Sequence, residues 1–527
     1  EPYRQSDENG DYEFTGLGAG TYTVRQEVQE GWGQTYPDGQ LNGGVPSNQL
    51  NSTSDSENLV VAGDTGSLQA DLVIDSGGED IRHRDNEVGG AGTELSTDAG
   101  QATQATGTAH SMPRLFRRPE LNEVVPWAAS GGAPQEAAGA PYGADWQDNS
   151  EYMIGDVLAS VVLLESEESV AGESEDWTPT EINAVKSEIQ QGLDWWETTF
   201  SSFPSPSPVH DLAFYPDFTY ADNPVGVDVE PIKGPQSDQG LWINDFLNAV
   251  GYNSAASYFD DLAHWNHDLR EAQNTDWAFT MFVVDSSNDS DGMFSDDYFA
   301  YAYLGGPFSV MTYDNNGWGI GNMGQVTAHE MGHIFYALDE YPDSGSYYDH
   351  SGYYNTQNFN AYDDHPNPSS RVASIMAEAS LQNESWSQNV TSPSSVEMIG
   401  WKDSDGDGVF DVLDVPLTLT GTGSFDSETG EYSFSGASSV NTLDNQNPRG
   451  AGNDITLNTV DEIQYRLDGG DWQSGNTYGV PDTAVSQTVA VTSPGNHTVD
   501  FRTVVSGSGV SSNLWSDSFT AEGGIGA

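Results

Sequence analysis

The sequence has 527 residues, which is too long for one ordinary domain and sufficient for about two to four. It contains 82 acidic residues against 15 Lys and Arg, a formal net charge of −67. Nucleic-acid binding requires a basic surface, so this charge excludes that class of protein. The absence of cysteine excludes disulfides, a thiol nucleophile and cysteine metal ligands.

The acidic residues are spread over the whole sequence rather than gathered in one tail. A chain with this charge repels itself at low ionic strength, where screening is weak. Its 14 Trp, 24 Tyr and 20 Phe exclude an acidic disordered protein, which has no core to fill. We therefore expect a folded protein that works in concentrated salt, from a halophile.

Membrane and targeting segments are not evident in the sequence. No apolar run approaches the roughly 18 residues of a membrane-spanning helix. The first residue is Glu1 and no signal peptide is visible, so we expect a processed chain or a fragment of a longer one.

Residues 1–37 alternate polar and apolar residues in short runs between turns, which predicts a β-hairpin. The string Asp7–Leu17, followed by Gly20-Thr21-Tyr22-Thr23-Val24, resembles the end of the B-type repeat modules of bacterial surface adhesins. The resemblance implies a partial β module, with attachment to a cell surface through missing N-terminal modules. Residues 38–149 are rich in small and polar residues and predict a flexible acidic linker. An apolar patch within residues 59–74 is compatible with a pair of strands inside this predicted linker.

Residues 150–402 alternate strand and helix patterns, which predicts an α/β domain. Thr178-Pro179-Thr180-Glu181 has the form of a capping box with proline in the first turn and predicts the start of a helix. Further strands are expected around residues 153–164, 212–215 and 277–284, and further helices near residues 240–250 and 255–272.

The string His329-Glu330-Met331-Gly332-His333 carries two histidines four residues apart. On a helix they lie on one face, so both imidazoles can bind one metal ion. Glu330 is the residue type that takes a proton from the water that such a metal activates. Without cysteine, a zinc ion here has only histidine and carboxylate ligands available. The sequence therefore predicts a catalytic zinc ion with Glu330 as the general base.

The segment from His329 to Tyr341, with Ala373-Ser374-Ile375-Met376-Ala377 downstream, resembles the metzincin zinc peptidases. It is similar to the snapalysin-like family and to the family that includes bacterial IgA-cleaving enzymes. The resemblance implies that Asp339 is the third zinc ligand and that Met376 belongs to the Met-turn beneath the metal.

Two alternatives for the third ligand stay open. The metzincin motif has a glycine where this sequence has Tyr336, and a bulky residue turns tightly only at a cost. Glu340 and the more distant Glu378 are the alternative carboxylate ligands.

Residues 403–414 fit an EF-hand-type calcium loop, with Gly408 at its turn and a final Asp as in dockerin-like loops. The predicted calcium ligands are Asp403, Asp405, Asp407, Val409, Asp411 and Asp414. Residues 285–297 have two interpretations, a second calcium site or an ordinary acidic surface loop.

Residues 415–527 alternate short strands with turns rich in Gly, Asp and Asn, which predicts an antiparallel β-sandwich. The segment resembles the immunoglobulin- or fibronectin-like modules appended to extracellular enzymes. The expected fold is multidomain: an α/β zincin domain resembling metzincins, then the calcium loop, then the all-β sandwich.

These features predict a secreted or cell-surface zinc endopeptidase that is adapted to high salt and hydrolyses polypeptides. One zinc ion would be catalytic, and one or more calcium ions structural. An extended substrate is expected along a strand near residues 303–312. The alternative is a calcium-stiffened surface or adhesion protein that carries a zincin fold without a proteolytic role.

Overall fold

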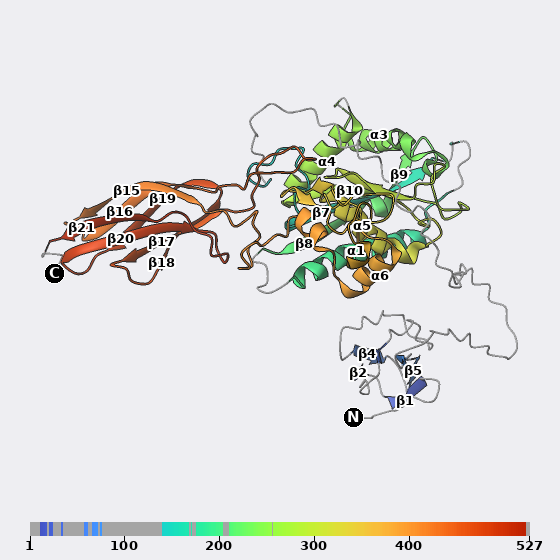
Figure 1. The fold of residues 1–527 in the computed structure, drawn as a ribbon, viewed down its shortest axis with the longest axis horizontal. Coiled ribbons are helices and arrows are strands. Elements are labelled where there is room, and N and C mark those ends of the chain that lie inside the picture. The colour runs from blue at the N-terminus through green and yellow to red at the C-terminus, as the bar shows by residue number, and fades with distance from the viewer. Residues whose placement is uncertain are drawn as a thin grey trace. The chain divides into compact units, whose positions relative to one another are not determined.

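The structure is a computed structural model in which the chain divides into two compact units, Glu1–Ala105 and Thr106–Ala527 (Figure 1). It describes residues 140–167, 170, 175–203, 210–253, 255 and 257–522, together with the backbone of six short strands between residues 11 and 75.

The six N-terminal strands form three antiparallel pairs. The pairs are β1 (Asp11–Leu17) with β5 (Gly66–Asp71), β2 (Gly20–Val24) with β4 (Glu57–Val61), and β3 (Gly33–Gln34) with β6 (Ile74–Asp75). Strands β4, β5 and β6 lie within residues 38–149, and most of their residues fall in the apolar patch that is compatible with a pair of strands. A lone hairpin is marginal in water and gains stability from further strands. The predicted linker between residues 76 and 139 lies outside the described residues.

The second unit begins with a mixed sheet, which agrees with the predicted α/β pattern. Its order is β11 (Ala300–Ala302), β12 (Phe308–Thr312), β10 (Trp277–Val284), β7 (Gly155–Ser166) and β8 (Leu212–Phe218), with β9 (Asn223–Val227) beside the end of β7. Only β11 runs antiparallel to its neighbour. The all-buried residues of β10 account for the continuous apolar run that marked this strand in the sequence.

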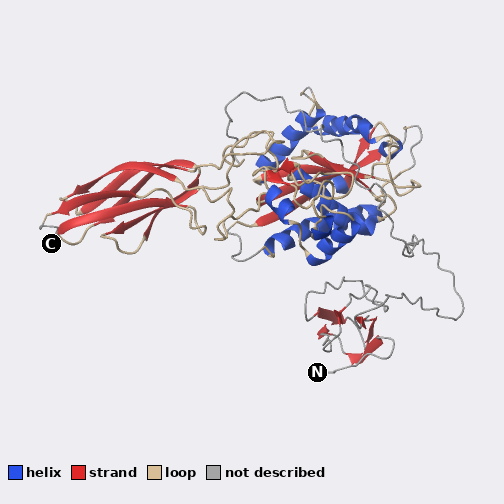
Figure 2. Ribbon diagram, viewed as in Figure 1, coloured by secondary structure: helices blue, strands red, loops and turns tan. Residues whose placement is uncertain are grey.

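Helices cover both faces of this sheet (Figure 2). Along β7, Val161 and Leu163 face one helical layer, whereas Val162 and Leu164 face the other. The first layer contains α1 (Pro179–Ser201) and α5 (Met323–Ile334), and the second contains α3 (Gln239–Val250) and α4 (Tyr258–Gln273). The shorter helices are α2 (Thr219–Asp222), α6 (Ala379–Gln388) and α7 (Pro393–Met398). No described helix has the length and apolarity needed to cross a membrane.

Helix α1 packs beside α5 in the same helical layer and holds it in place. It begins at the predicted capping box, where Thr178 and Glu181 cap each other's backbone N–H groups. Gly192 allows close approach, since a β-carbon there would lie 2.6 Å from the Thr327 side chain. The indole of Trp196 donates to the carbonyl oxygen of Ala328 at 2.9 Å. The position of α5 is therefore fixed by buried contacts along its length.

The C-terminal region consists of two antiparallel sheets, as the sequence predicted in outline. One contains β15 (Thr418–Asp426), β16 (Glu431–Ser439) and β19 (Asp482–Ala490); the other contains β18 (Gln473–Val480), β17 (Val460–Leu467), β20 (Gly495–Val504) and β21 (Trp515–Ala521). Aromatic side chains join them, with the rings of Phe434 and Phe501 stacked 4.6 Å apart.

The segment between β16 and β17 leaves these sheets and packs against the α/β region. The backbone N–H of Thr456 donates to Tyr142 O at 3.1 Å, and that of Ile455 donates to the Tyr353 hydroxyl at 2.9 Å. Residues 144 and 147–149 are buried in the same unit. The boundaries predicted at residues 150 and 415 therefore do not separate independent bodies. Both segments are rich in turn-forming residues, and the sequence does not show that these residues dock onto a distant surface.

The strand predicted to bind a substrate near residues 303–312 is not available in that form. Residues 308–312 form β12, which pairs with β10 on one side and β11 on the other. The edge strand on this side of the sheet is β11, and its three residues are buried. The prediction is wrong because strand order depends on pairing between distant segments, which local patterns do not specify.

Candidate metal centre

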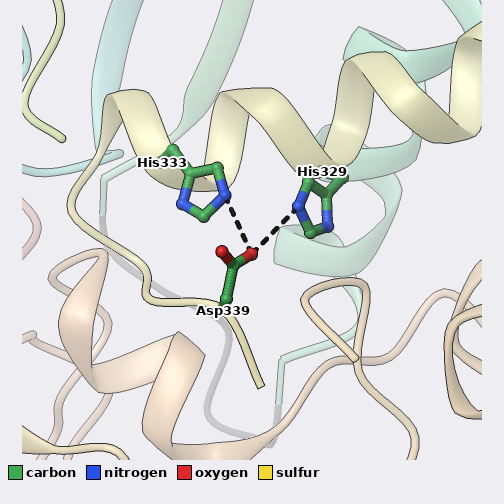
Figure 3. Close-up of side chains that lie close together, drawn as sticks. All are labelled: His329, His333 and Asp339. Carbon is green, nitrogen blue, oxygen red and sulfur yellow. Dashed lines mark ion pairs between the residues drawn. The ribbon is translucent and has the colours of Figure 1, made fainter. Parts of the chain in front are cut away.

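His329 and His333 project from the same face of α5 toward the carboxylate of Asp339 (Figure 3). Asp339 Oδ1 lies 3.3 Å from His329 Nε2 and 3.1 Å from His333 Nε2. Ligand atoms of a tetrahedral zinc ion are separated by ~3.3 Å when its bonds are about 2.0–2.1 Å long. Both distances from Asp339 Oδ1 match this spacing, and the three ligand atoms all lie within 4.8 Å of one another.

The protonation of the two imidazoles also fits a metal. His329 Nδ1 lies 2.9 Å from Ile375 O, and His333 Nδ1 lies 2.8 Å from Ala337 O. A carbonyl oxygen only accepts hydrogen bonds, so each Nδ1 carries a hydrogen and each Nε2 turns its lone pair to Asp339 in the neutral ring. Three electron-rich atoms then face one another inside the protein. A cation between them relieves this repulsion, and the carbonyl contacts orient the rings as in known metal sites.

Without a metal, a proton takes that role. Burial opposes the charged form of His333, but the pKa of His333 is raised to about 9 because the Asp339 carboxylate lies beside it. Burial also disfavours the charged form of Asp339, yet the two imidazoles hold the pKa of Asp339 well below its usual range. The site thus selects a positive charge between the histidines and the carboxylate.

Glu330 lies next to the site and is only 1% exposed. Among the described residues, neither of its carboxylate oxygens has a hydrogen-bond partner. Burial raises the pKa of Glu330 to about 8, against the opposing influence of His333. A buried acidic group without a partner costs stability, which is typical of a residue kept for chemistry.

The chain reverses direction directly after α5. Tyr336, at the position where the metzincin motif has glycine, adopts a left-handed φ of 72°. This conformation costs a non-glycine residue roughly 1–2 kcal/mol. It lets the N–H of Ala337 donate to Gly332 O at 2.8 Å, and the segment that follows carries Asp339 back toward the histidines. The turn that the ligand spacing requires is therefore made without glycine.

Tyr341 supports the third ligand from the other side. Its hydroxyl donates to Asp339 Oδ2 at 3.1 Å, which leaves Oδ1 to face the histidines. The ring centroids of Tyr341 and His329 are 6.2 Å apart. No motif in the sequence marks Tyr341 as a residue that supports a ligand. Its position two residues after Asp339 was visible, but the backbone path that turns its hydroxyl back was not.

The alternative third ligands are excluded by their contacts. Glu340 is fully buried, but its carboxylate accepts hydrogen bonds from Asn360 at 2.6 Å and from Ser395 at 2.9 Å, as well as from Ser392 and Ser394. Glu378 forms an ion pair with Arg371 at 2.6 Å. The carboxylate of Asp339 therefore faces both histidines, whereas those of Glu340 and Glu378 are held by other side chains.

Met376 lies against Gly332 in the last turn of α5. A β-carbon at Gly332 would be 2.5 Å from Met376 Sδ, so the sulfur occupies the space that glycine leaves on α5. The carbonyl of Met376 accepts from Glu340 N at 2.9 Å, and that of the preceding Ile375 accepts from His329. The segment predicted as a Met-turn therefore supports both the helix and the returning ligand segment.

In the predicted calcium loop, side-chain oxygens of Asp403, Asp405 and Asp407 all lie within 4.8 Å of one another. Asp411 and Asp414 are not part of this group; Asp411 accepts from Ser404 N at 2.8 Å. Burial raises the pKa of Asp414, with repulsion from the neighbouring carboxylates adding to the effect. Val409, the predicted backbone ligand, is buried together with Phe410.

Two other acidic regions carry weaker indications. His267, Asp268 and Glu271 are close enough to hold a cation, but Arg270 lies 2.9 Å from His267 Nδ1 and brings its own positive charge. In the segment 285–297, Asp289 is paired with Lys233 at 3.0 Å. In both regions a basic side chain already contacts one of the candidate ligands.

No protein-family model matches the sequence, and no curated protein is significantly similar to it. Function is therefore inferred from the site itself, because a fold alone does not define an activity.

Proposed function

We propose that the protein is a zinc-dependent endopeptidase. The observation that carries this proposal is the convergence of His329, His333 and Asp339 at zinc-ligand spacing beside a buried, unpartnered Glu330. A purely structural zinc site has four protein ligands and does not require a buried glutamate to accept a proton. A zinc ion held by these three residues would supply Lewis-acid chemistry to water or substrate.

In the proposed mechanism His329, His333 and Asp339 hold the metal. Zinc, when bound, acts as a Lewis acid and lowers the pKa of water to about 7. Glu330 accepts the proton of the attacking water and returns it to the leaving amine. Tyr341 keeps Asp339 oriented through the hydroxyl contact to Oδ2. The carbonyls of Ile375 and Ala337 keep the imidazoles in the tautomer that ligation needs.

The test is cleavage of an unfolded protein in molar salt with calcium present. We expect cleavage by the full chain, loss of cleavage after a chelator strips zinc, and recovery with zinc but not with calcium alone. Cleavage that persists without zinc would contradict the proposal. A zinc-loaded protein that cuts no unfolded substrate would favour the adhesion-protein alternative.

We also propose that the α/β region is a zincin domain similar to the metzincins and that the protein acts outside the cell in high salt. The zincin proposal is supported by the order along the chain of the motif His329–His333, Asp339 and the segment around Met376. The net charge of −67 supports the proposal of high salt. An immunoglobulin-like C-terminal module stays part of this proposal, supported by two antiparallel sheets joined through aromatic side chains.

The loop at residues 403–414 is proposed as a structural calcium site. At moderate salt, calcium at about 100 times its dissociation constant should stabilise the protein by about 2.7 kcal/mol. Asp403→Ala should abolish this gain, measured by thermal unfolding with and without calcium. Asp471→Ala, which removes an exposed carboxylate from a turn of the C-terminal sheets, is the control and should keep the full gain. An equal gain in both variants would refute the site.

A further inference from the structure

The segment 443–456, which we name the brace, lies in the connection between β16 and β17 and contacts the turn between His333 and Asp339. Within that turn, the Tyr336 hydroxyl donates to Glu151 Oε1 at 3.2 Å. Asn445 of the brace donates from Nδ2 to the other oxygen of Glu151, at 3.1 Å. Two hydrogen bonds through one buried carboxyl group thus connect the brace to the metal-binding turn.

The ring of Tyr336 is enclosed by two glycines. A β-carbon at Gly305 would lie 2.3 Å from the ring, and a β-carbon at Gly450 of the brace would lie 2.9 Å from the Tyr336 hydroxyl oxygen. Gly305 also donates from its N–H to His333 O at 3.1 Å. The ring therefore fills a space between the brace and the connection from β11 to β12.

The brace is itself anchored at several points. Asn445 Nδ2 also donates to Asn453 O at 2.9 Å, and Asn453 Nδ2 donates to Asp148 Oδ2 at 2.7 Å. Asn447 N donates to Asn445 Oδ1 at 3.0 Å. This anchored surface lies against Tyr336, whose left-handed conformation a non-glycine residue adopts only at a cost.

We propose that the brace is a positioning element of the metal centre: Asn445, through Glu151, holds Tyr336 in the left-handed turn that sets Asp339 against the histidines. The C-terminal region is then a working part of the proposed enzyme rather than an appended module. This inference rests on the proposed metal site, and its test is designed to separate the two.

The test measures cobalt binding to the full chain, because the visible spectrum of cobalt reports the geometry of its ligands. Asn445→Ala should weaken cobalt binding about 10–100-fold, the range found when groups that orient metal ligands are removed, and should change the spectrum. Tyr336→Phe, which removes only the hydroxyl, should cause a similar loss that does not add to that of Asn445→Ala. Asn476→Ala in β18, which also removes an amide that donates to a carbonyl, is the matched control and should bind as the wild type does.

A rescue experiment separates positioning from general stability. In a Tyr336→Gly background the turn costs little, because glycine adopts positive φ freely. Asn445→Ala should then weaken cobalt binding less than about threefold. An unchanged affinity and spectrum in folded Asn445→Ala, or an equal loss in both backgrounds, would overturn the brace and leave the metal site standing. A wild type that binds no cobalt would overturn both.

Discussion

Glu330→Gln should lower kcat/KM for peptide hydrolysis by about 10²–10⁴-fold while the protein keeps its zinc. Glutamine preserves the size of the side chain but cannot accept and return a proton. Glu330 contributes none of the three converging ligand atoms, so its replacement leaves the three predicted zinc ligands in place. Activity against an unfolded protein in molar salt and the zinc content of the purified variant are the two measurements.

The matched control is Glu384→Gln on α6, where the glutamate is exposed and its carboxylate contacts Gln388. This variant carries the same change of charge and should retain wild-type activity. Wild-type activity in Glu330→Gln would remove Glu330 from the mechanism. Equal loss in both variants would indicate a general effect of charge rather than a specific base.

Asp339→Ala should weaken zinc binding by more than about 100-fold, beyond the roughly 10–100-fold effect of losing an outer hydrogen-bond partner. The substitution removes the only carboxylate oxygen described within 3.3 Å of both histidines. It also removes the negative charge that raises the pKa of His333. The site then stabilises a positive charge, whether a proton or a zinc ion, less well. Competition with a chromophoric chelator measures the affinity.

Tyr341→Phe is the graded comparison for this experiment. It deletes the hydroxyl that donates to Asp339 Oδ2 but keeps the carboxylate, so zinc affinity should fall by about 10–100-fold and no further. Glu340→Ala, by contrast, should affect stability rather than the ligand set, because Glu340 is bonded to Asn360 and a group of serines. Wild-type zinc affinity in Asp339→Ala would overturn the assigned ligand set.

Local patterns were sufficient for the elements that carry the site. The helix from Thr178 was predictable because a capping box satisfies its own backbone groups. The strand at 277–284 was predictable because a strand buried on both faces is apolar throughout. Two histidines four residues apart share a helical face whatever surrounds them. These features depend on neighbours a few residues away.

Local sequence signals were therefore enough to predict the alternation of strands and helices, the pair of histidines with Glu330, and the antiparallel character of the C-terminal region. The three-dimensional fold was needed to show that Asp339, and not Glu340 or Glu378, faces the histidines, because the path of this segment depends on the left-handed turn at Tyr336. It also decided that β12 is an inner strand and that residues 443–456 return to the α/β region. Such contacts join segments far apart in the chain, and no local periodicity encodes them.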